Sequence, residues 1–384
     1  MASEWMINNW HPRMGIAIAL AGLAAILGAV AIPGTAQAAS PVISARAGET
    51  HTCGTRADGT LWCLGNNANG QLGLGDRSNR DAVTQVGTAT WANVDAGSYG
   101  TFGVQANGTL WCWGSGFQGQ LGLGDTADRL VPTQVGTATS WAAVDTVNET
   151  TCARRTDGAL YCWGNNTFGQ LGLGDTANRL TPVRVGSGLY MSIGTATSHV
   201  CAIRTNHTLW CWGDNSEGQL GQGNTISSAV PVQVGTAGNW SMVQSDSSDS
   251  CALRTTGTLW CWGFNSHGKL GLGDTTDRLT PTRVGTLSTW ASLSTGTFQT
   301  CAIQTNGTLW CWGWNISGEL GLGDTVERTV PTQVGTASTW ANVSTGWHHT
   351  TAVRTNGTLY GWGNNKFAQF SADNTNILSP RRLA

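Results

Sequence analysis

The sequence carries little charge and has no tract of one sign. Only 11% of its 384 residues are Asp, Glu, Lys or Arg, and the formal net charge is -2. Nucleic-acid-binding surfaces usually show clustered Lys and Arg, so we expect no nucleic-acid partner. The sequence also lacks a Ser nucleophile elbow, a zinc pair motif and a phosphate-binding loop that opens a helix. These absences predict a protein that is not an enzyme and needs no cofactor.

Helical periodicity is missing as well, because no segment keeps a 3.6-residue apolar period over ten residues. One long apolar run, Gly15–Ile32, follows Arg13 and precedes Ala36-Gln37-Ala38. This order is typical of a secretory signal peptide with a small-residue cleavage site. We therefore interpret residues 1–38 as a signal peptide and residues 39–384 as the mature domain. An uncleaved membrane anchor is the alternative, since the run is 18 residues long. Beyond this segment we expect no contact with a membrane.

Cysteine is present in pairs that are ten residues apart. In the segment TCAIQTNGTLWCW, an Asn-Gly sequence can close a three-residue hairpin loop. The resulting register puts Cys301 opposite Cys311 and Ala302 opposite Trp310. Directly opposed Cβ atoms lie about 4.5–5.5 Å apart, which is within reach of a disulfide. The spacing is too long for the usual thiolate pair of a zinc site.

Seven copies of this segment test the register. Five copies keep both cysteines, which predicts the disulfides Cys53–Cys63, Cys152–Cys162, Cys201–Cys211, Cys251–Cys261 and Cys301–Cys311. In the second copy Phe102 faces Cys112, which is left as a free thiol, and in the last copy both positions change together to Thr351 and Gly361. Five reduced, buried cysteine pairs are the alternative. Disulfides persist in oxidising compartments, so the pairs agree with the export signal and predict a secreted or cell-envelope protein.

The string Gly-Gln-Leu-Gly recurs every 49 or 50 residues, which indicates a repeat architecture. Its second position is occupied by Gln71, Gln120, Gln170, Gln219, Lys269, Glu319 and Gln369. Each unit contains four short candidate strands, for example Trp340–Thr345, Thr300–Thr305, Leu309–Gly313 and Pro331–Gly335. Four strands per unit, repeated radially, predict an all-β propeller.

The pattern T-C-A-x-x-T-x-G-x-L-W-C-W-G-x-N-x-x-G-Q-L-G-x-G-D recurs from about Val42 to Leu383 and resembles the regulator of chromosome condensation repeat. The resemblance implies a seven-bladed β-propeller of four-stranded blades. The last copy departs most, with Ala368-Gln369-Phe370-Ser371 in place of Gly-Gln-Leu-Gly. We infer that Ser379–Leu383 packs beside Val42–Ala47, so that pairing of the N- and C-terminal segments closes the ring.

An Asp and an Arg four residues apart follow Gly-Gln-Leu-Gly in five copies. The pairs are Asp76/Arg80, Asp125/Arg129, Asp175/Arg179, Asp274/Arg278 and Asp324/Arg328. The fourth copy loses both, with Asn224 and Ser228 in their positions. A protein needs a catalytic or metal-binding carboxylate only once. Because this Asp–Arg pair recurs in five copies, we predict that it is a structural contact that shapes a loop.

Function is expected where the copies differ, because loops carry recognition on a fixed scaffold. The segment before each cysteine strand is the most variable, and it supplies Tyr99, Phe298, Trp347 and His348 as predicted partner-binding residues. A second variable set, which can bind a partner or pack between blades, contains Phe117, Phe168, Phe264, Trp314 and Phe367. His348-His349 is also a weak candidate for a metal site, but loop histidine pairs are usually solvated and we expect no metal.

We therefore predict an exported, monomeric, protein-binding propeller whose partner the sequence does not identify. The resemblance includes secreted bacterial members that inhibit β-lactamases through aromatic loops on one rim. The alternative is guanine-nucleotide exchange on a small GTPase, the activity of the nuclear founder of the family. The export signal and the missing basic tail weigh against exchange. Light sensing, as in the related plant UV-B receptor, needs repeated Gly-Trp-x-His motifs, and only Gly346–His349 resembles one.

Overall fold

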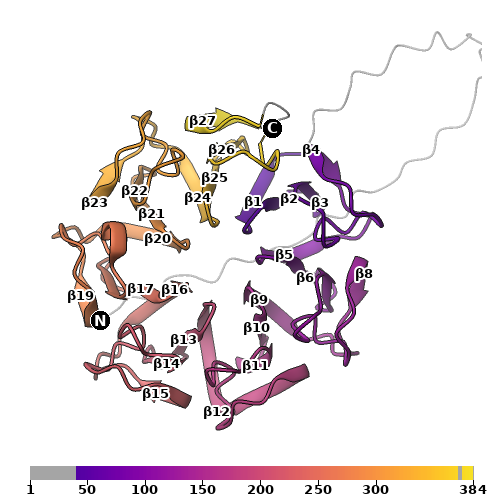
Figure 1. Ribbon diagram of the computed structural model, residues 1–384, viewed down its shortest axis with the longest axis horizontal. Coiled ribbons are helices and arrows are strands. Elements are labelled where there is room, and N and C mark those ends of the chain that lie inside the picture. Colours follow the sequence, from indigo (N-terminus) through magenta and orange to yellow (C-terminus); the bar gives the residue numbers. More distant parts are fainter. Residues whose placement is uncertain (1–39, 371–373, 384) are drawn as a thin grey trace, which may run out of the picture. The chain divides into compact units, whose positions relative to one another are not determined.

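The computed structural model describes residues 40–370 and 374–383, which belong to one compact unit. The predicted signal peptide, like the alternative membrane anchor, lies outside the described residues. Apart from the single 3-10 turn η1 (Ser266–Gly268), the described elements are β-strands, and Figure 1 shows them in radially arranged sheets. Within residues 40–370 and 374–383 there is no helix of the length and hydropathy that a membrane crossing requires.

Each repeat supplies four successive antiparallel strands, of which the first lies nearest the centre of Figure 1. First strands are β1 (Val42–Ala47), β5 (Trp91–Ala96), β9 (Trp141–Val147), β16 (Trp240–Asp246), β20 (Trp290–Thr295) and β24 (Trp340–Thr345). Second strands are β2 (His51–Arg56), β6 (Gly100–Gln105), β10 (Thr150–Arg155), β13 (His199–Arg204), β17 (Asp249–Arg254), β21 (Gln299–Gln304) and β25 (His349–Arg354).

The outer half of each sheet begins with the tryptophan-rich third strand. Third strands are β3 (Leu61–Gly65), β7 (Leu110–Gly114), β11 (Ala159–Gly164), β14 (Leu209–Gly213), β18 (Leu259–Gly263), β22 (Leu309–Gly313) and β26 (Leu359–Gly363). Fourth strands are β4 (Arg80–Gln85), β8 (Arg129–Gln134), β15 (Ser228–Gln233), β19 (Arg278–Arg283), β23 (Arg328–Gln333) and β27 (Ile377–Arg382).

One strand belongs to two repeats. β12 (Arg179–Thr195) pairs with β11 through its first part and with β13 from Tyr190 onward. It thereby joins two repeats into a sheet of seven strands, whereas the other described sheets have four strands each. The four-stranded unit predicted from the repeat is confirmed, and β12 adds a hydrogen-bonded connection that the sequence pattern did not predict.

The hairpin register between second and third strands is the predicted one. Cys301 faces Cys311 and Ala302 faces Trp310 in the ladder between β21 and β22. The turn contains Gly307 at φ 77°, a left-handed conformation that glycine adopts without steric cost. All five predicted disulfides are present, and Cys112 is a buried free thiol. Closing a loop of this length stabilises the fold by about 3 kcal/mol in the chain-entropy account.

The joint loss of both cysteines in the last copy has a steric reason. Phe370 replaces the leucine of Gly-Gln-Leu-Gly, and its larger ring occupies the space beside Gly361. A Cβ atom built at Gly361 would lie 2.3 Å from Cδ1 of Phe370, so a side chain at this position would have to displace the phenyl ring. In the last copy the Phe370 ring therefore occupies the volume that a disulfide and a leucine occupy in five other copies.

Neighbouring repeats are joined by buried tryptophans of the third strand. The Trp113 indole N–H donates to the backbone carbonyl of Gln71 in the preceding copy, at 2.9 Å. The same bond recurs for Trp163, Trp212, Trp262, Trp312 and Trp362. Each bond links the Gly-Gln-Leu-Gly loop of one copy to the core of the next.

The predicted Asp–Arg contacts are confirmed as ion pairs in all five copies, with Nη2–Oδ2 distances between 2.5 Å and 2.8 Å. In the first copy the amide of Asn67 also donates to Oδ1 of Asp76, at 3.0 Å. The Asp carboxylate thus pins the loop between the third and fourth strands. Its role is structural, as its repetition in the sequence indicated.

The predicted pairing of the N- and C-terminal segments is wrong. β27 pairs with β26 and β1 pairs with β2, so each terminal segment completes its own sheet. The physical reason is that β1, beginning at Val42, already supplies the first strand of its copy. The two ends meet instead through side chains, because Leu383 packs against a cluster that contains Val42 and Ala45. In addition, the Ala47 amide donates to Oγ of Ser344, at 3.0 Å.

Candidate functional site

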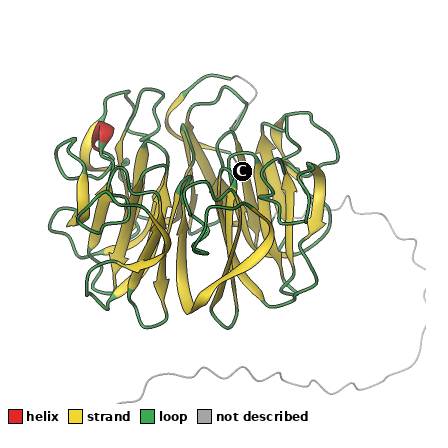
Figure 2. Cartoon of the chain, turned by 60° about the horizontal axis from the view of Figure 1, so that its bottom comes forward, coloured by secondary structure: helices red, strands yellow, loops and turns green. Residues whose placement is uncertain are grey.

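The variable loops predicted to carry function lie at one end of the strands. Since successive strands are antiparallel, loops that follow first and third strands share one end, and the tight turns share the other (Figure 2). We call the first end the aromatic rim. The loops between its first and second strands are residues 48–50, 97–99, 148–149, 196–198, 247–248, 296–298 and 346–348.

Three of the four predicted partner-binding residues form one stack on the aromatic rim. The His348 imidazole lies between two rings, with its centroid 4.9 Å from Trp347 and 5.4 Å from Phe298. Trp314 extends the stack, with its centroid 6.0 Å from that of Phe298. Trp347 is 38% exposed, so the stack presents a large ring to solvent. We call Phe298, Trp314, Trp347 and His348 the aromatic cluster.

Tyr99, the fourth predicted residue, lies apart from this cluster. Its ring contacts Phe117, with centroids 6.4 Å apart. The second variable set was expected either to bind a partner or to pack between blades, and its members differ in exposure. Phe117 and Phe168 are each 50% exposed, whereas Trp314 is half-buried in the aromatic cluster. The remaining members, Phe264 and Phe367, are half-buried.

A buried carboxylate lies beneath the aromatic cluster. Glu319 is fully buried at a position where five copies have Gln. One of its oxygens accepts a hydrogen bond from the Ser317 amide at 2.8 Å, and the other lies 3.4 Å from Nδ1 of His348. His349 differs from its neighbour, because it is fully buried and its Nε2 lies 3.2 Å from the Thr52 hydroxyl. The two histidines of the sequence pair therefore face different surroundings.

The aromatic rim surrounds the mouth of a cavity of about 580 Å³. The cavity runs between the first strands, and Tyr99, Phe298 and Trp347 are among the residues that line it. Its volume is in the range of pockets that bind small molecules. In each first strand, one residue lies opposite the position of the first hairpin cysteine in the ladder with the second strand. We call it the cavity-facing position. It varies between copies and is occupied by Arg46, Asp95, Asp145, Gly194, Gln244, Ser294 and Ser344.

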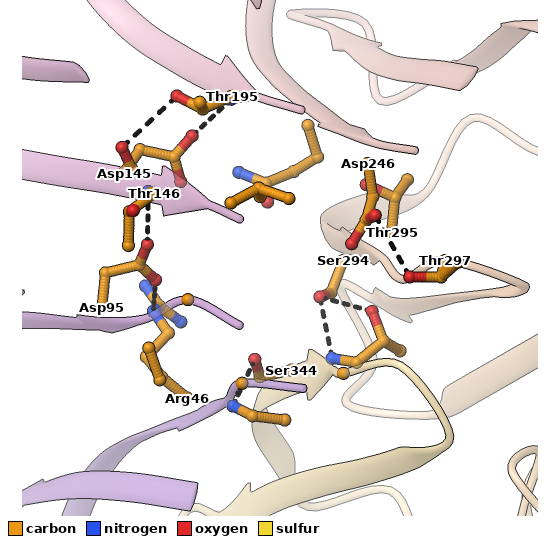
Figure 3. Close-up of a pocket in the computed structure, with 18 of the residues that line it drawn as sticks. Arg46, Asp95, Asp145, Thr146, Thr195, Asp246, Ser294, Thr295, Thr297 and Ser344 are labelled. Atoms are coloured by element: carbon orange, nitrogen blue, oxygen red, sulfur yellow. Dashed lines mark hydrogen bonds and ion pairs between the residues drawn. The ribbon is translucent and has the colours of Figure 1, made fainter. Parts of the chain in front are cut away.

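Side chains at the cavity-facing position form hydrogen bonds with the backbone of the adjacent first strand (Figure 3). Asp145 accepts a hydrogen bond from the Thr195 amide at 2.5 Å, and Asp95 accepts one from the Thr146 amide at 2.8 Å. Ser344 makes the equivalent bond to the Ala47 amide at 3.0 Å. A neutral hydroxyl is therefore sufficient for this junction, and the negative charge of the aspartates is not required for it.

Burial in the cavity wall raises the pKa of two aspartates. It raises the pKa of Asp145 to about 7, and the neighbouring Asp95 raises it further. Burial also raises the pKa of Asp246 to about 7, against the opposing effect of Lys269. Arg46 compensates Asp95 in part, with Nε 3.6 Å from Oδ1.

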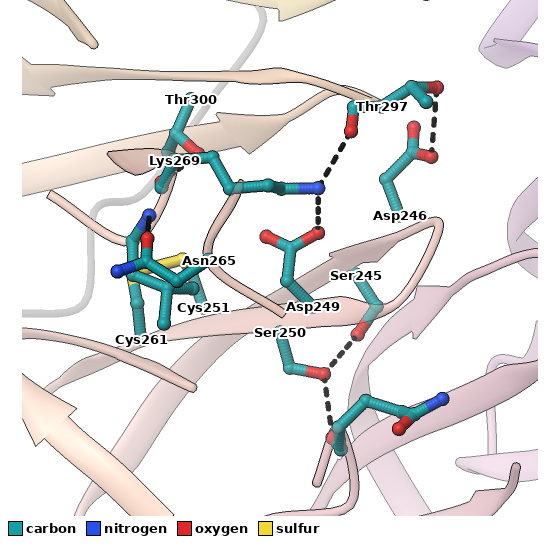
Figure 4. Close-up of polar contacts among 12 residues, drawn as sticks. Ser245, Asp246, Asp249, Ser250, Cys251, Cys261, Asn265, Lys269, Thr297 and Thr300 are labelled. Carbon is teal, nitrogen blue, oxygen red and sulfur yellow. Dashed lines mark hydrogen bonds and ion pairs between the residues drawn. A yellow bond between two sulfur atoms is a disulfide. The ribbon is translucent and has the colours of Figure 1, made fainter. Parts of the chain in front are cut away.

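A buried ion pair lies behind Asp246 (Figure 4). Nζ of Lys269 is 2.5 Å from Oδ1 of Asp249, and both side chains are almost completely buried. The same ammonium group donates to the Thr297 carbonyl at 2.7 Å, while the Thr297 hydroxyl donates to Asp246 at 3.4 Å. Burial raises the pKa of Asp249 to about 6, although Lys269 opposes the shift.

Sequence reasoning missed the cavity-facing position and the Lys269–Asp249 pair. Both could have been found with the criterion that located the rim, which is variation between copies at an equivalent position. Lys269 stands where five copies have Gln, and Asp145 stands where two copies have Ser. In residues 40–370 and 374–383, no three His, Cys, Asp or Glu side chains are grouped so that they could hold one metal ion.

Comparison with solved structures shows a shared fold. Human WBSCR16 aligns with a TM-score of 0.76 and 18% identity over 85% of this chain and 94% of that chain. The Saccharomyces cerevisiae protein Prp20p, in a structure whose title names its binding properties to Gsp1p and histones, aligns with a TM-score of 0.75 and 18% identity over 90% and 86%. Yeast RCC1 (Prp20) bound to Kap60 gives 0.75 and 18% over 90% and 84%.

A comparison with curated proteins finds no match. The regulator of chromosome condensation (RCC1) repeat is detected at residues 107–153, 157–203, 206–253, 256–303 and 306–353. A second description of the same repeat matches residues 42–71, 141–170 and 340–369. Together with the repeated hairpins, loop ion pairs and interlocking tryptophans, these matches show that the chain belongs to the regulator of chromosome condensation (RCC1) repeat family.

Proposed function

We propose that this protein is an exported binding module that holds a protein partner on its aromatic rim. The observation that carries the proposal is the aromatic cluster, in which Phe298, His348 and Trp347 stack at the mouth of the cavity. Large rings bury much apolar area with few rotatable bonds, and Trp is enriched among residues that dominate binding energy. The exposed face of Trp347 is therefore the proposed anchor.

Rigidity supports the choice of this cluster over other exposed rings. His348 is held between two aromatic rings and lies 3.4 Å from the buried Glu319. Trp314 backs Phe298 from the adjacent loop of the same repeat. A preorganised surface loses less conformational entropy when a partner binds, which favours affinity. Tyr99 and its neighbour Phe117 form a second, smaller contact point on the same rim.

Export is the second part of the proposal. Five hairpin disulfides are typical of proteins from oxidising compartments, and the N-terminal segment has the order of a signal peptide. We propose secretion or retention in the cell envelope, and a monomeric mature chain. Cleavage after Ala38 would release the propeller, and N-terminal sequencing of the exported protein tests this directly.

The third part of the proposal concerns the architecture that carries the rim. We propose seven blades, in which β12 serves as the fourth strand of one blade and the first strand of the next. Packing of β1 against β24 and β25 would then close the ring, through contacts such as the bond from the Ala47 amide to Ser344. A chain cut between the fourth and fifth copies should fail to fold as two stable halves if the ring is closed in this way.

Affinity capture tests the binding function. The mature protein is immobilised and exposed to extracellular and envelope fractions of the source cells, beside Trp347→Ala and Leu287→Ala variants. Leu287 is 41% exposed on the turn between β19 and β20, at the end opposite the aromatic rim. We expect a partner that is retained by the native protein and by the Leu287 variant and is lost from the Trp347 variant. Equal recovery on all three surfaces would contradict the proposal.

Guanine-nucleotide exchange, the alternative, rests on family membership alone. The Prp20p structure whose title names Gsp1p shares 18% identity with this chain, which is evidence for the fold. The same capture experiment separates the two functions when a cytosolic fraction is included. A small GTPase recovered in its nucleotide-free form, and independently of Trp347, would favour exchange over the rim-binding proposal.

A further inference from the structure

We propose that the central cavity binds an organic cation, a ligand with primary ammonium or guanidinium groups. Such a group can come from a free polyamine or from a basic side chain of a protein. The proposal goes beyond the rim-binding function, because the cavity is lined by different residues and can be tested with small molecules on the purified protein. It stands on the excess of acidic over basic side chains in the cavity wall, an unpartnered hydroxyl in that wall, and the different strands that supply its carboxyl groups.

The cavity wall contains more acidic than basic side chains. Four carboxyl side chains line the cavity, from Glu49, Asp95, Asp145 and Asp246, while Arg46 is the only Lys or Arg among its described lining residues. Arg46 lies beside Asp95, with Nε 3.6 Å from Oδ1. Clefts that carry one sign of charge and have low-dielectric walls focus the field and concentrate ligands of opposite charge.

Junction bonding does not explain these charges. Ser294 and Ser344 make the same kind of bond between first strands with a neutral hydroxyl, to the Thr345 and Ala47 amides at 3.0 Å. The carboxylate of Asp145 makes this bond too, but it adds a charge inside the protein at an energetic cost. A charge that is costly and unnecessary for the fold is expected where a ligand of opposite charge binds.

A second observation lies on the other side of the opening. Thr295 is only 6% exposed and lines the cavity, yet its hydroxyl has no hydrogen-bond partner among the described residues. It lies near Asp246 in Figure 3, on the side opposite Asp95 and Asp145. Buried hydroxyls are normally hydrogen-bonded, so this one marks a position where a ligand N–H or a water would complete the site. An ammonium group would donate to both the hydroxyl and the carboxylate.

An organic cation fits this arrangement better than a metal ion. Asp145 comes from β9 and Asp246 from the end of β16, and β12 lies between these strands around the centre (Figure 1). Across the described residues, metal-ligating side chains do not gather in the groups of three that one ion would need. A chain with nitrogen groups at both ends can instead satisfy carboxylates on two sides of the cavity, which at about 580 Å³ is large enough for it.

Isothermal titration calorimetry tests the proposal with four probes: putrescine, spermidine, a capped arginine peptide and butanediol. Butanediol has the length of putrescine without its charge. We expect the amines or the peptide to bind and butanediol not to bind. Tighter binding of the polyamines would identify a free ligand, and tighter binding of the peptide a protein side chain. Absence of binding by every cationic probe would overturn the proposal.

Matched variants locate the binding. Asp145→Asn and Asp246→Asn should each weaken binding of the best cationic probe about tenfold or more, the usual effect of losing a charge-assisted hydrogen bond. Asp81→Asn, at an exposed carboxyl on β4 outside the cavity, should leave binding unchanged. The native protein offers a second measurement that does not depend on the folding of variants. Equal binding by all three variants would place the ligand elsewhere and refute the site.

That second measurement is the pH dependence of binding. A cation favours ionised carboxylates, so it should release protons when it binds near pH 7 and should bind about tenfold or more weakly at pH 6 than at pH 8. The charged groups around the two carboxyls are Asp95 and Arg46 beside Asp145, and Lys269, Asp249 and Glu49 near Asp246. Binding that does not change across this range would contradict the assigned role of these aspartates.

Discussion

Phe102 lies directly opposite Cys112 in the ladder between β6 and β7, at the position where five other copies hold a disulfide. Both side chains are almost completely buried and belong to one core cluster. The Cys112 thiol donates to the Leu121 carbonyl at 3.0 Å, and burial raises its pKa. The second copy thus keeps the backbone of the stapled hairpin and fills its volume with a phenyl ring.

The Phe102→Cys variant should form a sixth hairpin disulfide with Cys112. Loop closure would stabilise the fold by about 3 kcal/mol, whereas loss of the buried ring would cost about 3–5 kcal/mol. The two effects nearly cancel, so we expect a small net change in the free energy of unfolding. Thiol counting under denaturing conditions should find one thiol in the native protein and none in the variant. A remaining thiol in the oxidised variant would contradict the register of the second copy.

Lys269→Gln should destabilise the fold by about 3–5 kcal/mol, because it leaves Asp249 buried without its cation. Chemical denaturation measures this change. The natural control is the double variant Lys269→Gln with Asp249→Gln, since Gln occupies both equivalent positions in other copies. We expect the double variant to recover most of the lost stability. Additive losses in the two single variants and the double variant would show that the pair is not coupled.

His199→Gln should flatten the acid limb of the stability curve. Burial lowers the pKa of His199 to about 3, so the folded protein excludes a proton that the unfolded chain binds below about pH 6.5. This contribution to stability is complete above that pH and is lost as the pH falls towards 3, by about 1.4 kcal/mol per pH unit. Gln299 occupies the equivalent position in another copy, which makes glutamine a compatible replacement.

The measurement is the difference in free energy of unfolding between the native protein and the His199 variant at several pH values. Taking this difference removes the contribution of Asp145 and Asp246, whose pKa values are raised by burial. Their effect on the pH dependence of stability has the opposite sign to that of His199. A difference that stays constant between about pH 4 and pH 7 would mean that His199 has the same pKa in the folded protein as in the unfolded chain, which would contradict the account.

The hairpin chemistry was readable from the sequence because each copy tests the others. The last copy loses the equivalents of both Cys301 and Cys311, and the fourth copy loses the equivalents of both Asp324 and Arg328. Contacts could be inferred from this joint loss, and both are present in the structure. The closing segment was not readable in this way. Nothing in the repeat pattern says whether the last strand, Ile377–Arg382, completes its own sheet or joins the first, and only the register with β26 decides this.

The candidate site was predicted only where its residues are local in sequence. Trp347 and His348 are adjacent and were found together. The stacking of His348 on Phe298, fifty residues away in the neighbouring copy, depends on how two first strands pack. The cavity was missed for the same reason. Asp145 and Asp246 each look like ordinary surface carboxyls in their own strands, and they share a wall only because the sheets are arranged radially.

The anchoring role of Trp347 is the central claim, and the affinity of Trp347→Ala for the captured partner tests it most directly. We predict a dissociation constant at least about tenfold higher than that of the native protein, as expected when a central aromatic anchor is removed. The midpoint of thermal unfolding should stay nearly unchanged, because the ring is 38% exposed. Leu287→Ala, on the opposite end, should bind with native affinity. Unchanged affinity in Trp347→Ala would contradict the account, whatever the affinity of Leu287→Ala.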